Sequence, residues 1–222
     1  MAITKKAIIE AIHTGTSIAN AKYESWSNGS WVTDSGVECL MVTYIAESVS
    51  ENQEEHEILD LEVSFKEIRA WSEAKAGRGR RPATLKGRNR ADIVLFNGIG
   101  RPTCVIEVKR TWNADLCWTD LERIRDLVQS CSRKRGGSLR RGFLAMMIAK
   151  KSTREKSSEL RIEEQAKKIR ELIDTEFDGK GQDVKFHLGQ VESTGERFQE
   201  LYGDWKSMSF CIEISSKNRS NM

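Results

Sequence analysis

Two apolar runs within residues 91–110 carry two acidic side chains and a lysine. The segment ADIVLFNGIGRPTCVIEVKR has two apolar runs joined by NGIGR, which predicts a β-hairpin. A turn centred near Ile99–Gly100 places Asp92 directly opposite Glu107, because the two residues are equally far from that centre. Opposed side chains point to the same face with Cβ atoms ~5 Å apart, and Lys109 is then a diagonal neighbour of Asp92. A slip of one residue would put Asp92 on the wrong face, so the spacing predicts one register.

Two carboxylates held this close repel each other, and a divalent cation between them removes the repulsion. Mg²⁺ favours a few carboxylate oxygens together with water and phosphate oxygens. Lys109 could hold or deprotonate a water molecule, or stabilise charge in a transition state at phosphorus. This combination of residue types indicates metal-assisted hydrolysis of a phosphodiester. A buried Asp/Glu–Lys ion network without chemistry is the alternative.

These residues resemble the motif of the PD-(D/E)xK nuclease superfamily, which includes type II restriction endonucleases, archaeal Holliday-junction resolvases and RecB-type nucleases. Asp92 matches the first acid, and Glu107-Val108-Lys109 matches the D/E-x-K element, while Ala91 stands where the motif usually has proline. The resemblance covers residues from about 35 to 150. It implies that Asp92 and Glu107 bind Mg²⁺ or Mn²⁺, that the Val108 carbonyl is a further ligand, and that Lys109 assists the attacking water.

Many members of that superfamily also place a glutamate of the first core helix at the site, and Glu38 is the candidate here. Ser35 and Glu38 have the spacing of a capping box, so Glu38 could instead only cap its helix. Glu47 is the second candidate on the same helix. Arg125 and Gln129, on the helix after the motif, could contact substrate or be solvated helix residues.

Basic residues concentrate in two Gly-containing segments near the hairpin, although the net charge of the chain is only +3. Such segments suit the phosphate backbone of a nucleic acid, and DNA is the expected partner. Ordinary solvated loops are the alternative. The candidate contacts are Arg78, Arg80, Arg81, Lys86, Arg88 and Arg90 in the first segment, and Arg133, Lys134 and Arg135 in the second.

The pattern of elements predicts an α/β fold with a restriction-endonuclease-like core, in which helices flank a central mixed sheet. Short helices are expected before residue 30, and residues 58–76 are ambiguous between strand and helix. Further capping-box patterns predict helices that begin at Thr119 and at Ser152. Strands are expected over 90–96, 103–109, 142–149, 184–188 and 207–215. Residues 1–34 are interpreted as a helical extension packed on a nuclease-like domain of residues 35–222.

The remaining features exclude several classes of protein. The five cysteines form no C-x-x-C pair and the three histidines lack ligand spacing, so neither a disulfide framework nor a zinc site is expected. We expect no signal peptide and no membrane contact, hence a cytoplasmic chain. The predicted function is a metal-dependent DNA endonuclease, as a homodimer if it cuts both strands. The alternatives are a non-catalytic nucleic-acid-binding module with the same fold and an assembly protein that binds an acidic partner.

Overall fold

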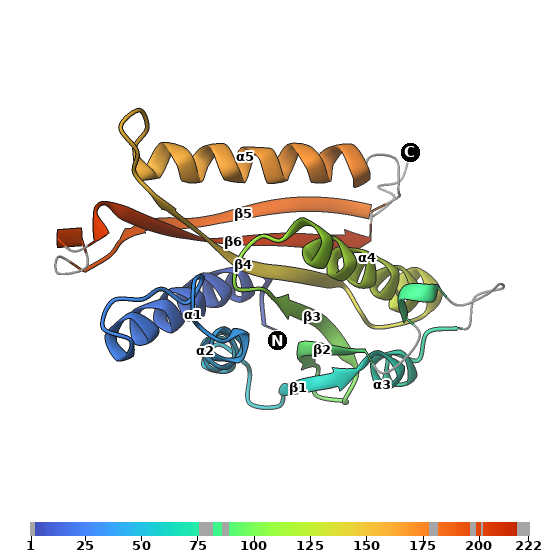
Figure 1. Cartoon of the computed structure of the whole chain (residues 1–222). Helices are drawn as coiled ribbons and strands as arrows, with labels where there is room; N and C mark the ends of the chain where they lie inside the picture. Colours follow the sequence, from blue (N-terminus) through green and yellow to red (C-terminus); the bar gives the residue numbers. More distant parts are fainter. Residues whose placement is uncertain are drawn as a thin grey trace.

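A six-stranded mixed sheet with helices on both faces forms the protein (Figure 1), in a computed structural model that describes residues 3–75, 82–85, 89–177, 182–195, 199–200 and 202–216. The order of strands is β1-β2-β3-β4-β6-β5, with β3 and β4 parallel and the other neighbours antiparallel. The predicted α/β class and flanked mixed sheet are confirmed.

The strands are β1 (Ile58–Ser64), β2 (Arg90–Phe96), β3 (Pro102–Val108), β4 (Arg141–Lys151), β5 (Gln182–Ser193) and β6 (Trp205–Ser216). The helices are α1 (Lys5–Trp26), α2 (Glu38–Ser50), α3 (Phe65–Trp71), α4 (Ala114–Cys131) and α5 (Ser158–Phe177), with 3₁₀ turns η1 (Ala83–Leu85) and η2 (Arg133–Arg135).

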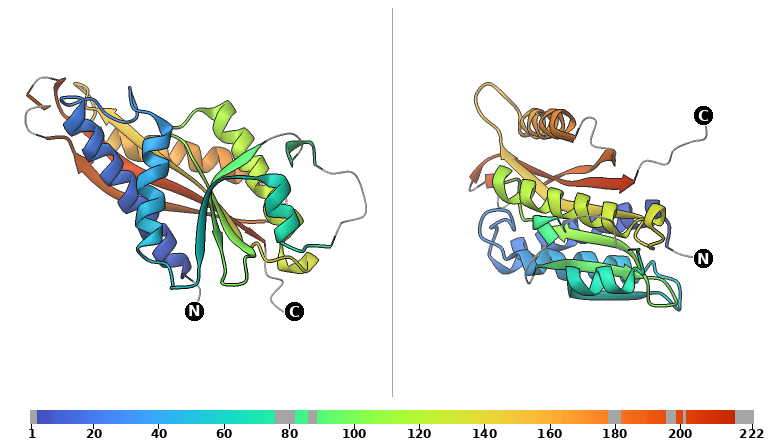
Figure 2. Two further views of the ribbon diagram at one scale, coloured as in Figure 1. Left: turned by 90° about the horizontal axis from the view of Figure 1, so that it is seen from below. Right: turned by 90° about the vertical axis from the view of Figure 1, so that its right-hand side faces the viewer.

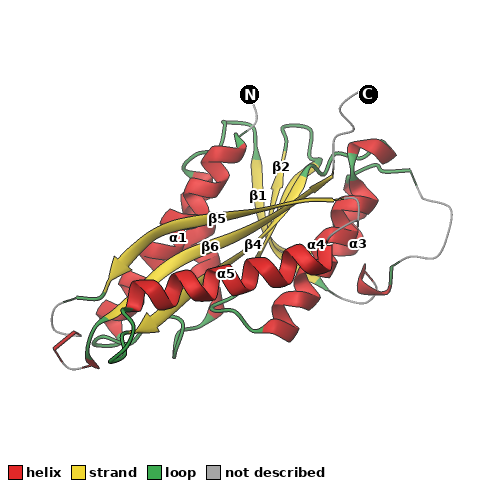
Figure 3. Cartoon of the chain, turned by 90° about the horizontal axis from the view of Figure 1, so that it is seen from above, coloured by secondary structure: helices red, strands yellow, loops and turns green. Residues whose placement is uncertain are grey.

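Each face of the sheet is buried under its own set of helices, as the left view of Figure 2 shows. Helices α1 and α2 share an apolar cluster with alternate strand residues such as Ile106 and Phe143. Helices α3, α4 and α5 cover the other face, where Val105 and Leu144 point. Figure 3 shows α5 lying over β4, β5 and β6. The alternation of side chains along β3 therefore decides which helices a residue meets.

The β2–β3 hairpin has the predicted register. Ile93 pairs with Ile106 and Leu95 with Cys104, so one further step places Asp92 opposite Glu107. The turn is closed by the Asn97 side chain, whose Oδ1 accepts hydrogen bonds from the backbone N–H groups of residues 99 and 101. The hairpin prediction is confirmed. The register could be predicted because it depends only on local alternation and a short turn.

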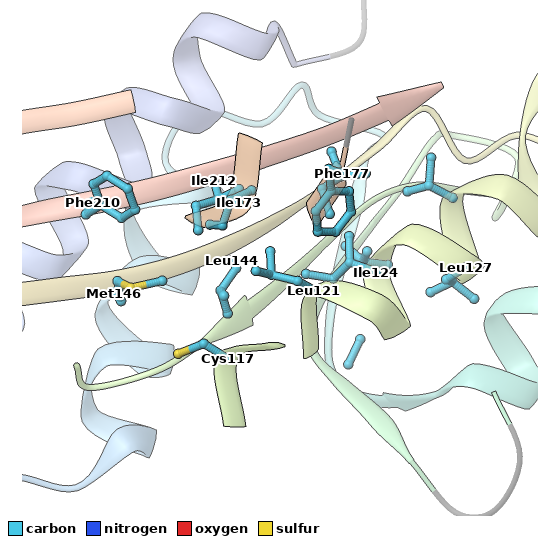
Figure 4. Close-up of a cluster of buried hydrophobic side chains, with 14 of the residues drawn as sticks. Cys117, Leu121, Ile124, Leu127, Leu144, Met146, Ile173, Phe177, Phe210 and Ile212 are labelled. Carbon is cyan, nitrogen blue, oxygen red and sulfur yellow. The ribbon is translucent and has the colours of Figure 1, made fainter. Parts of the chain in front are cut away.

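Helix α4 connects the parallel strands β3 and β4, and it begins earlier than predicted. The side chain of Asn113 accepts a hydrogen bond from the backbone N–H of Leu116 and caps the helix, which starts at Ala114. Thr119 lies inside the helix and donates to the carbonyl of Asp115, so the predicted start at Thr119 is wrong. Figure 4 shows the apolar side of α4 meeting the sheet and α5, with Cys117, Leu121, Ile124 and Leu127 facing Leu144, Met146, Ile173, Phe177, Phe210 and Ile212.

The start of α5 also differs from the prediction, and the ambiguous segment before residue 76 is now assigned. Helix α5 begins at Ser158, and the segment from Ser152 to residue 157 precedes it. The ambiguous residues 58–76 form both β1 and α3, and the capping box there joins Ser64 to Glu67. The side chain of Ser64 accepts from the N–H of Glu67, and the Glu67 carboxylate accepts from the N–H of Ser64. A strand therefore passes directly into a helix at Ser64.

The N-terminal segment forms one long helix where shorter helical stretches were expected. Helix α1 packs against α2, β4 and β6, and its Ile8 and Ile12 are buried in the same cluster as Ile45 of α2. Gly15 lies at the crossing, where a Cβ atom would come within 2.5 Å of the Ile45 Cα atom. No helix among the described residues is both long and apolar enough to cross a membrane.

Candidate functional site

A cleft of about 510 Å³ opens where β3 ends. The β3 arrow ends between α2 and α4 in Figure 1, and the cleft takes side chains from α2, β1, β2, β3 and α4. It brings Asp92, Glu107, Lys109 and Glu38, all predicted from sequence, into one place. Its charged residues are five acids, Glu38, Glu62, Asp92, Glu107 and Asp120, and three cations, Arg90, Lys109 and Arg123.

Asp92 bridges the two strands of the hairpin. Its Oδ2 accepts a hydrogen bond of 2.7 Å from the backbone N–H of Val108, which fixes the carboxylate beside the end of β3. Burial raises the pKa of Asp92 from 3.8 to about 6, since the Val108 hydrogen bond and the nearby Lys109 only partly offset it and Glu38 adds repulsion. Asp92 therefore exchanges its proton close to neutral pH.

Glu107 is a buried acid of the cleft, with 5% of its surface exposed. Among the described residues, none donates a hydrogen bond to its carboxylate. Burial raises its pKa well above the ordinary value, repulsion by Asp92 and Asp120 adds to the rise, and Lys109 and Arg123 oppose it. A buried carboxylate without donors needs a proton or a cation to neutralise it.

Lys109 follows the end of β3, and its ammonium group lies close to three oxygen acceptors. Its Nζ lies 2.9 Å from Glu38 Oε1, 3.2 Å from Asp120 Oδ2 and 3.0 Å from the Val108 carbonyl oxygen. Burial alone would lower the pKa of Lys109, and it is the largest single effect, but the hydrogen bond to Glu38 and the charges of Asp120, Glu38 and Asp92 together raise it. The ammonium stays protonated at neutral pH, so in this arrangement Lys109 supplies positive charge and does not deprotonate water.

Glu38 is the first residue of α2 and does not cap it. The N-cap is Val37, without a side-chain hydrogen bond, so the predicted capping box of Ser35 and Glu38 is wrong. The Glu38 carboxylate is instead bonded to Lys109. Glu47 is exposed and lies nine residues along α2, ~13 Å from Glu38 at the helical rise, so it is away from the cleft.

Three charged cleft residues were missed by sequence reasoning. Asp120 is 4% exposed and binds Lys109 from α4, and Arg123 binds Asp120 at 2.7 Å one turn along the same helix. An acid one turn before an arginine, beside the apolar stripe of Cys117 and Leu121, was the available signal. Glu62 has a left-handed backbone (φ 56°) where β1 passes Asp92. No pattern in the sequence indicates that Glu62 adopts this conformation or lines the cleft.

The predicted nucleic-acid contacts separate into three groups. Arg90 lines the cleft. Arg78, Arg80, Arg81, Lys86 and Arg88 lie outside the described residues. The third group, Arg133, Lys134 and Arg135, forms η2, close to where β4 starts and so at the opposite end of the parallel strands from Lys109. On α4, Gln129 is exposed, and Arg125 bonds to the neighbouring Asp126 at 2.9 Å.

A divalent cation at the hairpin would meet the two opposed carboxylates of Asp92 and Glu107. Within the described part of the chain, no three or more His, Cys, Asp or Glu side chains are grouped so as to hold a metal ion. Mg²⁺ in proteins is commonly held by one or two carboxylates and keeps several waters. The buried Glu107 carboxylate, to which no described residue donates a hydrogen bond, and the opposed Asp92 therefore fit this ion.

Comparison with protein-family models, with curated protein sequences and with solved structures finds no match to this chain.

Proposed function

We propose that this protein is a metal-dependent nuclease that hydrolyses phosphodiester bonds, and that its substrate is DNA. The observation that carries the proposal is the buried Glu107 carboxylate, which lies opposite Asp92, lines an open cleft and receives no hydrogen bond from any described residue. The resemblance of Asp92 and Glu107-Val108-Lys109 to the PD-(D/E)xK motif supports the same assignment, with Lys109 in the lysine position.

Asp92 and Glu107 would hold Mg²⁺ or Mn²⁺, with the Val108 carbonyl as the further ligand that the resemblance implies. When bound there, the ion supplies Lewis-acid polarisation of a phosphate oxygen and lowers the pKa of water. Lys109 presents a fixed positive charge to the phosphate as negative charge grows on it. Glu38 and Asp120 act as positioning residues, since they hold the ammonium from two sides.

The charge of the cleft supports a bound cation. Its five acids outnumber its three cations, so a fully ionised cleft would repel the phosphates of a nucleic acid. A divalent cation between Asp92 and Glu107 would offset this excess of negative charge and so remove the repulsion of the substrate phosphates. The same site thus needs a metal both to neutralise its acids and to admit its substrate.

The test is cleavage of a defined panel of plasmid, linear duplex, branched and single-stranded DNA, with Mg²⁺ or Mn²⁺ and with EDTA. We expect cleavage by the wild-type chain with metal, loss of cleavage in Asp92→Ala and in Lys109→Ala, and wild-type rates in Glu47→Ala, an exposed control on α2. Full-rate cleavage by both cleft variants would remove the site assignment. The pattern of products on the panel defines the preferred substrate.

One observation favours a second candidate, a nucleic-acid-binding module without catalysis. The Lys109 ammonium lies within hydrogen-bonding or ion-pairing distance of the Glu38 carboxylate, the Asp120 carboxylate and the Val108 carbonyl oxygen. Such a set of partners is also typical of an ion network with a purely structural role. Such a module would bind DNA equally well with EDTA and would show no heat of Mg²⁺ binding that Glu107→Ala removes. Salt-dependent DNA binding without a metal site would establish this candidate over the nuclease.

A further inference from the structure

A second pocket, of about 650 Å³, lies at the other end of the sheet from the cleft. It is formed where β4 and β5 begin and β6 ends, beside the start of α1 and η2. Its cationic lining residues are Lys5, Arg133, Lys134, Arg140, Arg141 and Lys185. The acids among its described lining residues are Asp183 and Glu213.

This basic pocket is separate from the cleft. Arg141 pairs in register with Cys104 in the parallel strands, five residues before Lys109, which corresponds to ~17 Å along β3. The faces differ as well, because Cys104 belongs to the cluster under α1 and α2, whereas the alternation of β3 puts Glu107 on the side of α4. One phosphate group cannot occupy both places.

The two acids among the described lining residues offset only part of the formal positive charge of the pocket. The buried Glu213 is shared by Lys5 at 3.6 Å, Arg141 at 3.9 Å and His187 at 3.1 Å. Asp183 lies 3.2 Å from Lys185. The Nη1 atom of Arg141 is buried and has no hydrogen-bond partner among the described residues.

The pKa of Arg140 also indicates an excess of positive charge in this pocket. Partial burial lowers the pKa of the Arg140 guanidinium and repulsion by Arg133 and Arg141 lowers it further, while Glu57 opposes the fall. Like charges gathered around a hollow repel one another unless an anion enters between them. Arginine guanidinium groups present forked donors that match the oxygens of a phosphate.

We propose that this basic pocket is a phosphate-binding site, which takes a phosphate group carried by a nucleic-acid end or by a small phosphorylated molecule. Arg133 and Arg140 are exposed and approach the anion from the solvent side, and Arg141 offers its buried Nη1, which has no hydrogen-bond partner among the described residues although Glu213 lies 3.9 Å away. The site does not depend on the nuclease activity, because it shares no residue with the cleft.

The test is calorimetric titration of the full chain with inorganic phosphate. We expect binding by the wild type, and a loss of about tenfold or more in affinity in the double variant Arg133→Ala/Arg140→Ala, since charge-assisted hydrogen bonds are removed. Both residues are exposed, so the fold should be retained, which circular dichroism checks. The matched control Lys167→Ala/Lys168→Ala removes the same charge from the exposed side of α5 and should bind as the wild type does.

Two oligonucleotides of one sequence, with and without a 5′-phosphate, distinguish the sources. Tighter binding of the phosphorylated strand that disappears in the double variant assigns the pocket to strand ends, and binding of inorganic phosphate alone assigns it to small molecules. Glu107→Gln should bind phosphate as tightly as the wild type, so a failure of the nuclease proposal would leave this result unchanged. Absence of phosphate binding, or equal binding by the double variant and its control, would overturn the proposal.

Discussion

The Nζ atom of Lys109 lies 2.9 Å from Oε1 of Glu38, and this ion pair joins the end of β3 to the first turn of α2. The two residues are far apart in the sequence, and one follows the last residue of β3 while the other begins α2. The pair holds the ammonium at the cleft, beside the opposed carboxylates of the hairpin. The position of the lysine therefore depends on helix packing as well as on the strand that carries it.

Replacing Glu38 by glutamine should slow cleavage between about tenfold and a hundredfold, the usual effect of losing a group that orients a site residue. The variant removes a negative charge that raises the pKa of Lys109. The alkaline limb of the pH–rate profile should therefore move to lower pH, a change that a purely structural role would not produce. Glu47→Gln, on the exposed side of the same helix, is the matched control, and an unshifted profile in Glu38→Gln would contradict the role.

Replacing Asp120 by asparagine should lower the free energy of unfolding by about 2 kcal/mol, because Lys109 and Arg123 lose a buried counter-charge. The loss falls below that of a fully buried pair because both cations are partly exposed. Asp115→Asn, in the exposed first turn of α4, should lower the free energy of unfolding by only about 0.5 kcal/mol. Urea denaturation measures both variants. Equal losses would show that Asp120 stabilises the fold no more than an exposed helix residue does.

The metal-free protein should lose stability as the pH rises through about 6. The pKa of Asp92 is raised from 3.8 to about 6 on folding, so its protonated form favours the folded state below 3.8 and this contribution is lost above 6. The difference corresponds to ~3 kcal/mol. Asp92→Asn keeps an oxygen to accept from the Val108 N–H and removes the titration.

The expected result is that Asp92→Asn is more stable than the wild type at about pH 8 in EDTA, and nearly equal to it at about pH 4. Thermal melting at the two pH values measures the difference. A stability difference that does not change with pH would show that the carboxyl of Asp92 is not perturbed by burial.

Gly15→Ala should destabilise the protein by about 2 kcal/mol, because the added methyl group would overlap the backbone of α2 at Ile45. This overlap outweighs the ~1 kcal/mol by which alanine favours a helix over glycine. Thr14→Ala, on the exposed side of α1, should be neutral or slightly stabilising. If Gly15→Ala melts at a temperature as high as Thr14→Ala does, the close crossing of the two helices is not present.

Local patterns predicted the hairpin well and the helix starts poorly. Alternation and a short turn determine that Asp92 faces Glu107, and both are readable within twenty residues. The S/T-x-x-E spacing is common, so it misplaced helix starts at Ser35, Thr119 and Ser152, while the actual capping box lies at Ser64.

The remainder of the candidate site depends on tertiary packing. Asp120 reaches Lys109 only because α4 begins at Ala114 and returns across β3 to reach β4. The same crossover carries Arg133 to the far end of the strands, although it lies only 24 residues after Lys109 in the sequence. No spacing rule in the sequence encodes either placement.

Binding of a divalent cation at Glu107 and Asp92 is the central claim, and it can be measured without knowing the substrate. Mn²⁺ titrated into the metal-free protein by calorimetry should bind at about pH 7.5 and more weakly near pH 5, because both acids must release their protons. Glu107→Gln should lose this binding, whereas Glu122→Gln, on α4 and outside the cleft, should retain it. Equal Mn²⁺ affinity in Glu107→Gln and the wild type, or no binding by either, would contradict the account.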